Sequence, residues 1–194
     1  MIFREVEDRD LIARAKQGHV DAYNVLVSRW EKRVFNYLLR LISNRETAQD
    51  LSQDVFLKAW QNLRKLEEAD KFPSWLFRIA HNEAYSLLRK TRPEEEIVSE
   101  PLSGDRMARL YPVETALAVR TALTHLSPEQ REAVVLKIYE GFKFEEMAQI
   151  LDIPLSTVKS RLYSALEILK DALAPLESRR SASTDAERRG TGSF

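Results

Sequence analysis

Small hydroxyl side chains, with a lysine and a tyrosine among them, gather on one side of a helical stretch over residues 156–164. The opposite side of the same helix is an apolar stripe, so the hydroxyl side is the exposed one. Hydroxyl and ammonium groups hydrogen-bond phosphates and base edges, and such a surface can therefore approach DNA closely. A short amphipathic helix over 144–151 and a tight turn at 152–154 precede it, and together they predict a helix-turn-helix. The alternative is an ordinary hairpin of amphipathic helices.

A second polar surface is predicted about eighty residues upstream, on a helix over 73–90. Its members follow the spacing of one helix face: Arg78, His81, Asn82, Tyr85, Arg89 and Arg92. Guanidinium, amide and aromatic groups on one stripe can grip a phosphate backbone and can stack on or hydrogen-bond an unstacked base. A basic face that is merely solvated is the alternative. We expect Trp75, near the start of this helix, to belong to the core.

The helix before it carries two carboxylates, Asp50 and Asp54, four residues apart. Like charges at this spacing cost an isolated helix about 0.2–0.5 kcal/mol, so an external group should compensate them. An acidic face of this kind suits a basic partner surface. A chance pair of surface carboxylates is the alternative.

Helical periodicity dominates the first part of the chain. Four helices are expected there, over 10–17, 21–41, 46–63 and 73–90, with a polar loop over 64–71. Gly18 ends the first helix, Asn44 offers an N-cap to the third, and Pro73 opens the fourth. These helices make up a first domain, residues 1–92.

The rest of the chain divides into a tether over 93–112, a second helical domain over 113–176 and a tail over 177–194. The tether holds three prolines and a net negative charge, which predicts flexibility. In the second domain, Ser127, Pro128 and Gln130 form a strong helix-start signal. The tail is rich in Ser, Arg and Gly and is expected to be disordered. The predicted fold class is all-α, with two small helical domains joined by a flexible acidic linker.

The composition narrows the class of protein. The 194 residues include no cysteine, which excludes disulfides and thiolate metal sites and fits a reducing compartment. No apolar run approaches the roughly 20 residues of a membrane span, and the acidic N-terminus is unlike a secretion signal. We expect a cytoplasmic protein without membrane insertion, cofactor, bound metal or catalytic residue.

The predicted helix-turn-helix domain is slightly acidic, which is unusual for a domain that binds DNA. The whole chain has 30 Lys+Arg and 30 Asp+Glu, and residues 113–176 carry 7 of the former against 9 of the latter. Neutralisation of phosphates normally supplies much of the affinity for DNA. The helix-turn-helix domain alone should therefore bind DNA weakly, and we infer that a larger partner brings it there.

Four blocks of sequence, residues 48–60, 72–82, 126–131 and 157–162, resemble the extracytoplasmic-function (ECF) group of bacterial sigma factors. The blocks occur in the order and spacing of that family, and the resemblance covers about residues 8–175. It implies a sigma2-like domain at 1–92 and a sigma4-like domain at 113–176.

The resemblance also implies functional surfaces. The residues that would bind the β′ clamp helices of core RNA polymerase are Asp50, Gln53, Asp54, Phe56 and Leu57. Those that would bind the −10 promoter element, near a pocket for a flipped base, are Arg78, Asn82, Tyr85 and Arg89. Those that would bind the −35 element are Ser156, Thr157, Lys159, Ser160, Arg161, Tyr163 and Ser164. The chain departs from the family pattern at Ser86, where many relatives have an acidic residue, and at Asp152 and Ser156, where many have glycine. These departures leave details of base readout and turn geometry open.

The resulting hypothesis is a transcription initiation factor that binds core polymerase, including its β flap, directs it to −35 and −10 elements and promotes strand opening. An anti-sigma factor is a partner that the resemblance implies. The leading alternative is a stand-alone DNA-binding regulator, which would bind duplex DNA tightly without polymerase. An enzyme is the third and weakest alternative, because the sequence has no Gly-rich phosphate loop and no Glu-x-x-His pair.

Overall fold

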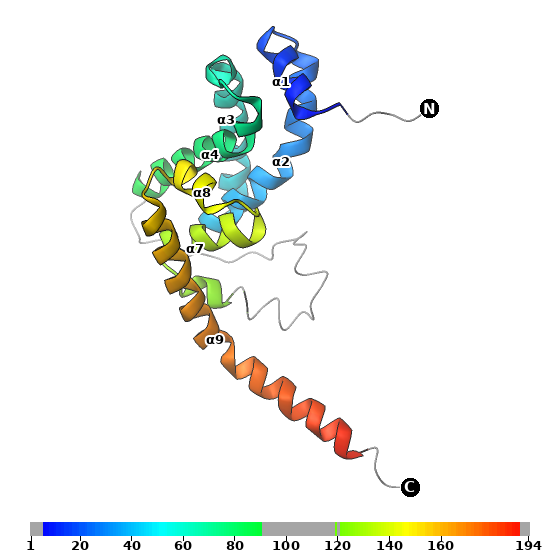
Figure 1. Cartoon of the computed structure of the whole chain (residues 1–194), viewed down its shortest axis with the longest axis vertical. Coiled ribbons are helices and arrows are strands. Elements are labelled where there is room, and N and C mark those ends of the chain that lie inside the picture. The colour runs from blue at the N-terminus through cyan, green and yellow to red at the C-terminus, as the bar shows by residue number, and fades with distance from the viewer. Residues whose placement is uncertain (1–5, 91–118, 120, 191–194) are drawn as a thin grey trace. The chain divides into compact units, whose positions relative to one another are not determined.

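Figure 1 shows a computed structural model of the chain, which describes residues 6–90, 119 and 121–190. Within these ranges every regular element is a helix, so the prediction of an all-α fold is confirmed. The chain divides into two compact units, one formed by 1–100 with 135–158 and the other by 101–134 with 159–194. The predicted linker at 93–112 lies outside the described residues.

The first helix, α1 (Asp8–Lys16), lies against α2 (Val20–Ile42). Leu11, Ile12 and Ala15 are its buried residues. At its first turn, the carboxylate of Asp8 accepts hydrogen bonds from Arg29 Nη1 at 2.7 Å and from Trp30 Nε1 at 2.8 Å. Gly18 has a φ of +97°, a conformation that costs glycine little, and it ends α1 as predicted.

Three helices, α2, α3 (Arg45–Asn62) and α4 (Phe72–Lys90), enclose the core of this unit. Among its fully buried side chains are Leu26, Val34, Tyr37, Leu38, Val55, Leu76 and Phe77. The rings of Tyr37 and Phe77 meet edge to face with centroids 5.1 Å apart. The predicted N-cap of α3 is confirmed, because Asn44 Oδ1 accepts a hydrogen bond from the amide of Thr47 at 2.9 Å.

The connection between α3 and α4 is more ordered than the polar loop predicted over 64–71. It contains two 3₁₀ turns, η1 (Leu63–Lys65) and η2 (Ala69–Lys71). Leu63 and Leu66 are buried at 1% and 4% exposure, so two apolar anchors hold a connection that is otherwise polar. Burial of these two side chains offsets part of the conformational entropy that the connection loses when it is ordered.

The later helices follow the predicted signals closely. α7 (Pro128–Val134) starts with a reciprocal cap, in which Ser127 Oγ accepts from the amide of Gln130 and Gln130 Oε1 accepts from the amide of Ser127. A π-helical turn, η3 (Val135–Tyr139), follows α7. Then come α8 (Phe144–Leu151) and α9 (Leu155–Gly190).

The helix α9 continues to Gly190, whereas a disordered tail was expected over 177–194. Residues 177–189 contain neither proline nor glycine, so nothing in them terminates the helix before Gly190. The last four residues lie outside the described part of the chain. In that part, none of the helices is both long and apolar enough to cross a bilayer.

Candidate nucleic-acid interface

The polar face predicted on the helix at 73–90 is exposed on α4. Arg78, Asn82 and Arg89 are exposed and Tyr85 is half-buried. The opposite face buries Leu76, Phe77, Ala80 and Ala84. The tyrosine ring lies 4.5 Å from the ring of His81, centroid to centroid. The helix therefore presents cations and an amide outward while its apolar face fixes its rotation.

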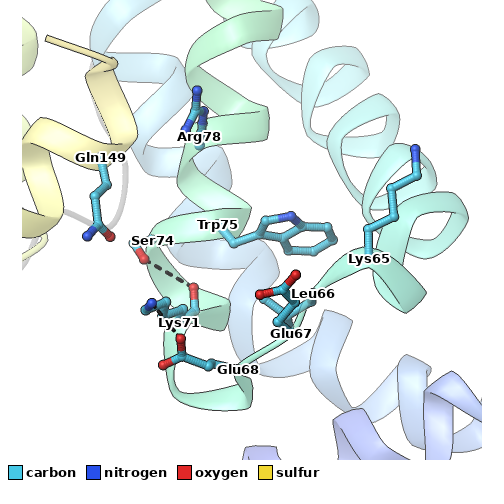
Figure 2. Close-up of a pocket in the computed structure, with 9 residues that line it drawn as sticks. All are labelled: Lys65, Leu66, Glu67, Glu68, Lys71, Ser74, Trp75, Arg78 and Gln149. Atoms are coloured by element: carbon cyan, nitrogen blue, oxygen red, sulfur yellow. Dashed lines mark hydrogen bonds and ion pairs between the residues drawn. The ribbon is translucent and has the colours of Figure 1, made fainter.

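A hollow of about 260 Å³ opens beside this face, where the connection before α4 meets the start of that helix (Figure 2). The residues that line it are Lys65, Leu66, Glu67, Glu68, Lys71, Ser74, Trp75, Arg78 and Gln149. This volume is at the small end of ligand pockets, so it suits one nucleobase better than a run of nucleotides. Figure 2 shows the indole of Trp75 between Arg78 and the stretch that carries Lys65 and Leu66.

The polar groups around the hollow are held by short contacts. Lys71 Nζ lies 2.6 Å from Glu68 Oε1, and this hydrogen bond and the charge of Glu68 raise the pKa of Lys71. Ser74 Oγ donates a hydrogen bond of 3.1 Å to the carbonyl oxygen of Lys71. Arg78 Nη2 lies 3.2 Å from Asp152 Oδ2. An aromatic ring, three cations and carboxylate acceptors at one hollow can stack a base, contact a phosphate and accept from exocyclic amines.

Most residues of this hollow were not predicted from the sequence. Residues 64–71 were expected only to form a polar loop and Trp75 to belong to the core, whereas Trp75 is half-buried and lines the hollow. The available signal was an aromatic residue next to a connection that is rich in charges of both signs, such as Lys65 and Glu67. That signal does not show which groups converge, because convergence depends on how the connection folds.

The predicted polymerase-binding residues lie on α3. Asp50, Gln53 and Asp54 are exposed and Leu57 is 56% exposed, but Phe56 is only 8% exposed. Instead of projecting outward, Phe56 helps to line an open hollow of about 710 Å³ between α2 and α3. The other residues of that hollow are Val27, Glu31, Lys32, Phe35, Arg45, Gln49, Ser52 and Gln53. The exposed carboxylates thus lie on the helix that forms one side of a part-apolar hollow.

The turn between α8 and α9 contains Asp152 in the left-handed conformation, with a φ of 55°. Aspartate adopts this region more readily than most side chains, so the departure from glycine at this position is compatible with a tight turn. The amide of Ile153 donates a 3.3 Å hydrogen bond to the carbonyl oxygen of Ala148, which closes the end of α8. The helix-turn-helix geometry therefore forms without glycine at this position.

The predicted −35 residues lie on the first turns of α9. Ser156, Lys159, Ser160 and Ser164 are exposed, and Tyr163 is 56% exposed. Thr157 and Arg161 are half-buried. The apolar stripe of the same helix begins with Val158, which is fully buried, and continues with Leu162 at 3% and Ala165 at 0% exposure. The helix thus offers the predicted polar side to solvent.

Two family models match the chain. Residues 26–94 match Sigma-70 region 2, and residues 116–169 match Sigma-70, region 4. The ECF RNA polymerase sigma-E factor of Haemophilus influenzae is 31% identical over 186 residues, which cover 89% of this chain and 98% of that protein. The RNA polymerase sigma-H factor of Pseudomonas aeruginosa is 29% identical, over 88% of this chain and 95% of its own.

Two solved structures resemble this chain over most of its length. CnrH, in complex with the cytosolic domain of CnrY, matches with a TM-score of 0.66 and 29% identity, over 87% of this chain and 97% of CnrH. The sigma factor RpoE of Bartonella quintana, in complex with the anti-sigma factor NepR, matches with a TM-score of 0.64 and 27% identity, over 78% and 96%. The chain therefore belongs to the ECF group of the sigma-70 family and is a sigma factor, which directs RNA polymerase to promoters.

Proposed function

We propose that this sigma factor opens promoter DNA by holding one extruded base of the −10 element in the hollow beside α4. The observation that carries the proposal is the convergence of Trp75, Lys71 and Arg78 on a space of about 260 Å³. Extrusion of a base costs a few kcal/mol, and stacking on an indole together with contacts to cations can offset this cost. The chain itself makes and breaks no bond, so we propose a factor that is not an enzyme.

The −35 element is read by the start of α9. The exposed hydroxyls of Ser156, Ser160 and Ser164 allow the helix to come close to a groove, while Lys159 supplies a cation for phosphate. Residues 113–176 remain net acidic, so this contact alone is weak. Joint attachment of both DNA-binding surfaces to polymerase raises their effective concentration at the promoter.

Attachment to core polymerase is proposed to use the exposed face of α3. Asp50 and Asp54 offer two carboxylates to a basic surface on the β′ clamp helices, and the β flap is the proposed second contact. Because two of the solved relatives are bound to protein partners, one of them named an anti-sigma factor, we also propose an anti-sigma partner for this chain. The proposed compartment is the cytoplasm, where polymerase acts.

The experiment that tests this function combines purified chain with core polymerase on promoter DNA and maps the 5′ ends of new transcripts. New start sites that require the chain, with promoter binding that requires polymerase, support the proposal. Tight sequence-specific binding of the chain alone to duplex DNA at physiological salt would favour a stand-alone regulator instead. Absence of new 5′ ends together with absence of co-elution with polymerase would overturn the proposal.

A further inference from the structure

The helix α1 is fixed firmly to the body of its unit. Asp8 bonds to both Arg29 and Trp30 on α2, and Leu11 and Ile12 are 2% and 1% exposed. Burial of two such side chains gives α1 a strong apolar attachment. The helix can therefore act as a rigid support for any segment that its exposed side chains contact.

Two basic side chains of α1 hold the connection between α3 and α4. Arg9 Nη2 lies 3.0 Å from Asp70 Oδ1 and 2.9 Å from Asp70 Oδ2, so one nitrogen contacts both carboxylate oxygens. Seven residues further along the helix, Lys16 Nζ donates a hydrogen bond to the carbonyl oxygen of Leu66. The two contacts span the connection from Leu66 to Asp70.

This same connection forms one wall of the hollow beside α4. Leu66, Glu67, Glu68 and Lys71 line the hollow (Figure 2), and Asp70 immediately precedes Lys71. Most side chains of this wall are polar and exposed. A segment with few buried apolar contacts opens locally at low cost in free energy. The contacts from α1 restrain this wall, although Arg9 and Lys16 do not themselves line the hollow.

We propose that Arg9 and Lys16 are positioning residues, which hold residues 66–71 in the shape that determines which base the hollow accepts. This inference rests on the proposed function of the hollow and extends it to a helix that does not line it. The ion pair between Arg9 and Asp70 is exposed, with side chains 66% and 76% accessible, so its effect on global stability is small. Its effect should instead be concentrated on the local shape of the connection.

The test uses the full chain with core polymerase and a fork-junction promoter in four versions, which differ only in the base at the extruded position. The measured quantity is the ratio of the holoenzyme's affinity for the preferred base to its affinity for the others. We expect the double variant Arg9→Gln with Lys16→Met to lower this ratio about fivefold, the scale of one lost polar contact at each end of the connection. Association with polymerase should stay at the wild-type level.

Arg14→Gln is the matched control. Arg14 is also an exposed arginine of α1, and its Nη2 lies 2.8 Å from Asp21 Oδ2, away from the connection. This variant removes an ion pair of the same kind from the same helix and should leave the base ratio unchanged. Reversing the pair gives a second test, because Arg9→Asp should lower the ratio and Arg9→Asp with Asp70→Arg should restore it.

Hydrogen exchange of the free protein provides a readout that does not depend on DNA. We expect the amides of residues 66–71 to exchange faster in the double variant, while the amides of α2 and α4 keep their wild-type rates. An unchanged base ratio in the double variant, with a changed ratio in Arg78→Ala with Asn82→Ala, would overturn this inference alone. No base preference in the wild-type holoenzyme would overturn the proposed function, and the inference with it.

Discussion

The hydroxyl of Tyr23 on α2 donates a hydrogen bond of 2.5 Å to the backbone carbonyl oxygen of Phe56 on α3. Tyr23 is only 7% exposed, and its ring lies 4.8 Å from that of Trp60, also on α3. A polar contact and a ring contact thus join the two helices. They fix the rotation of α3 about its axis, so that Asp50 and Asp54 face outward on the surface proposed for polymerase.

Substitution of Tyr23 by phenylalanine should destabilise the fold modestly at neutral pH and change its response to alkali. Loss of one buried hydrogen bond costs about 1 kcal/mol. Burial raises the pKa of Tyr23 above its usual value of 10.0, with a partly opposing effect from a backbone hydrogen bond at Trp60. The unfolded tyrosine therefore ionises first, and the wild-type protein should begin to lose the contribution of this group as pH rises above about 10.

Urea unfolding of both proteins from pH 8 to pH 11 measures this difference. The free energy of unfolding of the wild type should fall toward that of Tyr23→Phe above pH 10, because the variant has no ionisable group at this position. Parallel pH profiles for the two proteins would show that the buried hydroxyl does not perturb the titration.

Reversal of the two carboxylates on α3 should abolish binding to core polymerase. In Asp50→Arg with Asp54→Arg, two exposed negative charges that face a proposed basic surface become positive, and like charges across an interface are strongly unfavourable. We expect the affinity to fall by at least about a hundredfold, with the circular dichroism spectrum and thermal midpoint unchanged. Co-elution with core polymerase and a binding titration measure the effect. Asp10→Arg, at an exposed carboxylate of α1, is the control, and equal affinities for the two variants would reject the proposed surface.

The local signals of the sequence were sufficient to predict most helix ends. Asn44, Ser127 and Gln130 cap helices as predicted, since a capping residue and its partner are three positions apart. The exposed faces of α4 and α9 also followed from periodicity alone. Contacts between distant segments could not be predicted in this way. Arg9 and Asp70 are 61 positions apart, and nothing in either neighbourhood indicates the other.

The buried position of Phe56 illustrates the same limit. Family resemblance placed it on the polymerase-binding surface together with Asp50 and Gln53, but a helix face is defined by what packs on it. Here α2 packs against α3, and Phe56 turns into the hollow between them. Its role on the proposed surface therefore depends on access through that hollow, which sequence spacing does not reveal.

Removal of the polar groups beside the hollow should separate promoter binding from promoter opening. Arg78→Ala with Asn82→Ala deletes an exposed cation and an exposed amide from α4, whereas the −35 surface and the α3 face stay intact. We expect closed complexes to form normally and open complexes to decrease about tenfold or more, since the extruded base loses charge-assisted contacts. Permanganate reactivity of unpaired thymines measures opening, and filter binding measures the closed complex. Arg14→Ala is the control, and normal permanganate reactivity in the double variant would contradict base capture at this face.

Lys159 provides a test of the −35 surface that does not involve strand opening. It is the exposed lysine within residues 156–164, so its proposed partner is a phosphate and its contribution should depend on salt more than on sequence. In Lys159→Ala, holoenzyme binding to promoters with a −35 element should weaken about equally across −35 variants, and the slope of log affinity against log salt should decrease by about 1. Lys170→Ala is the matched control, because Lys170 is an exposed lysine of the same helix about three turns further along. A salt slope that changes equally in both variants would mean that α9 contributes only general charge. Loss of discrimination between −35 sequences in Lys159→Ala would instead place this lysine on a base edge.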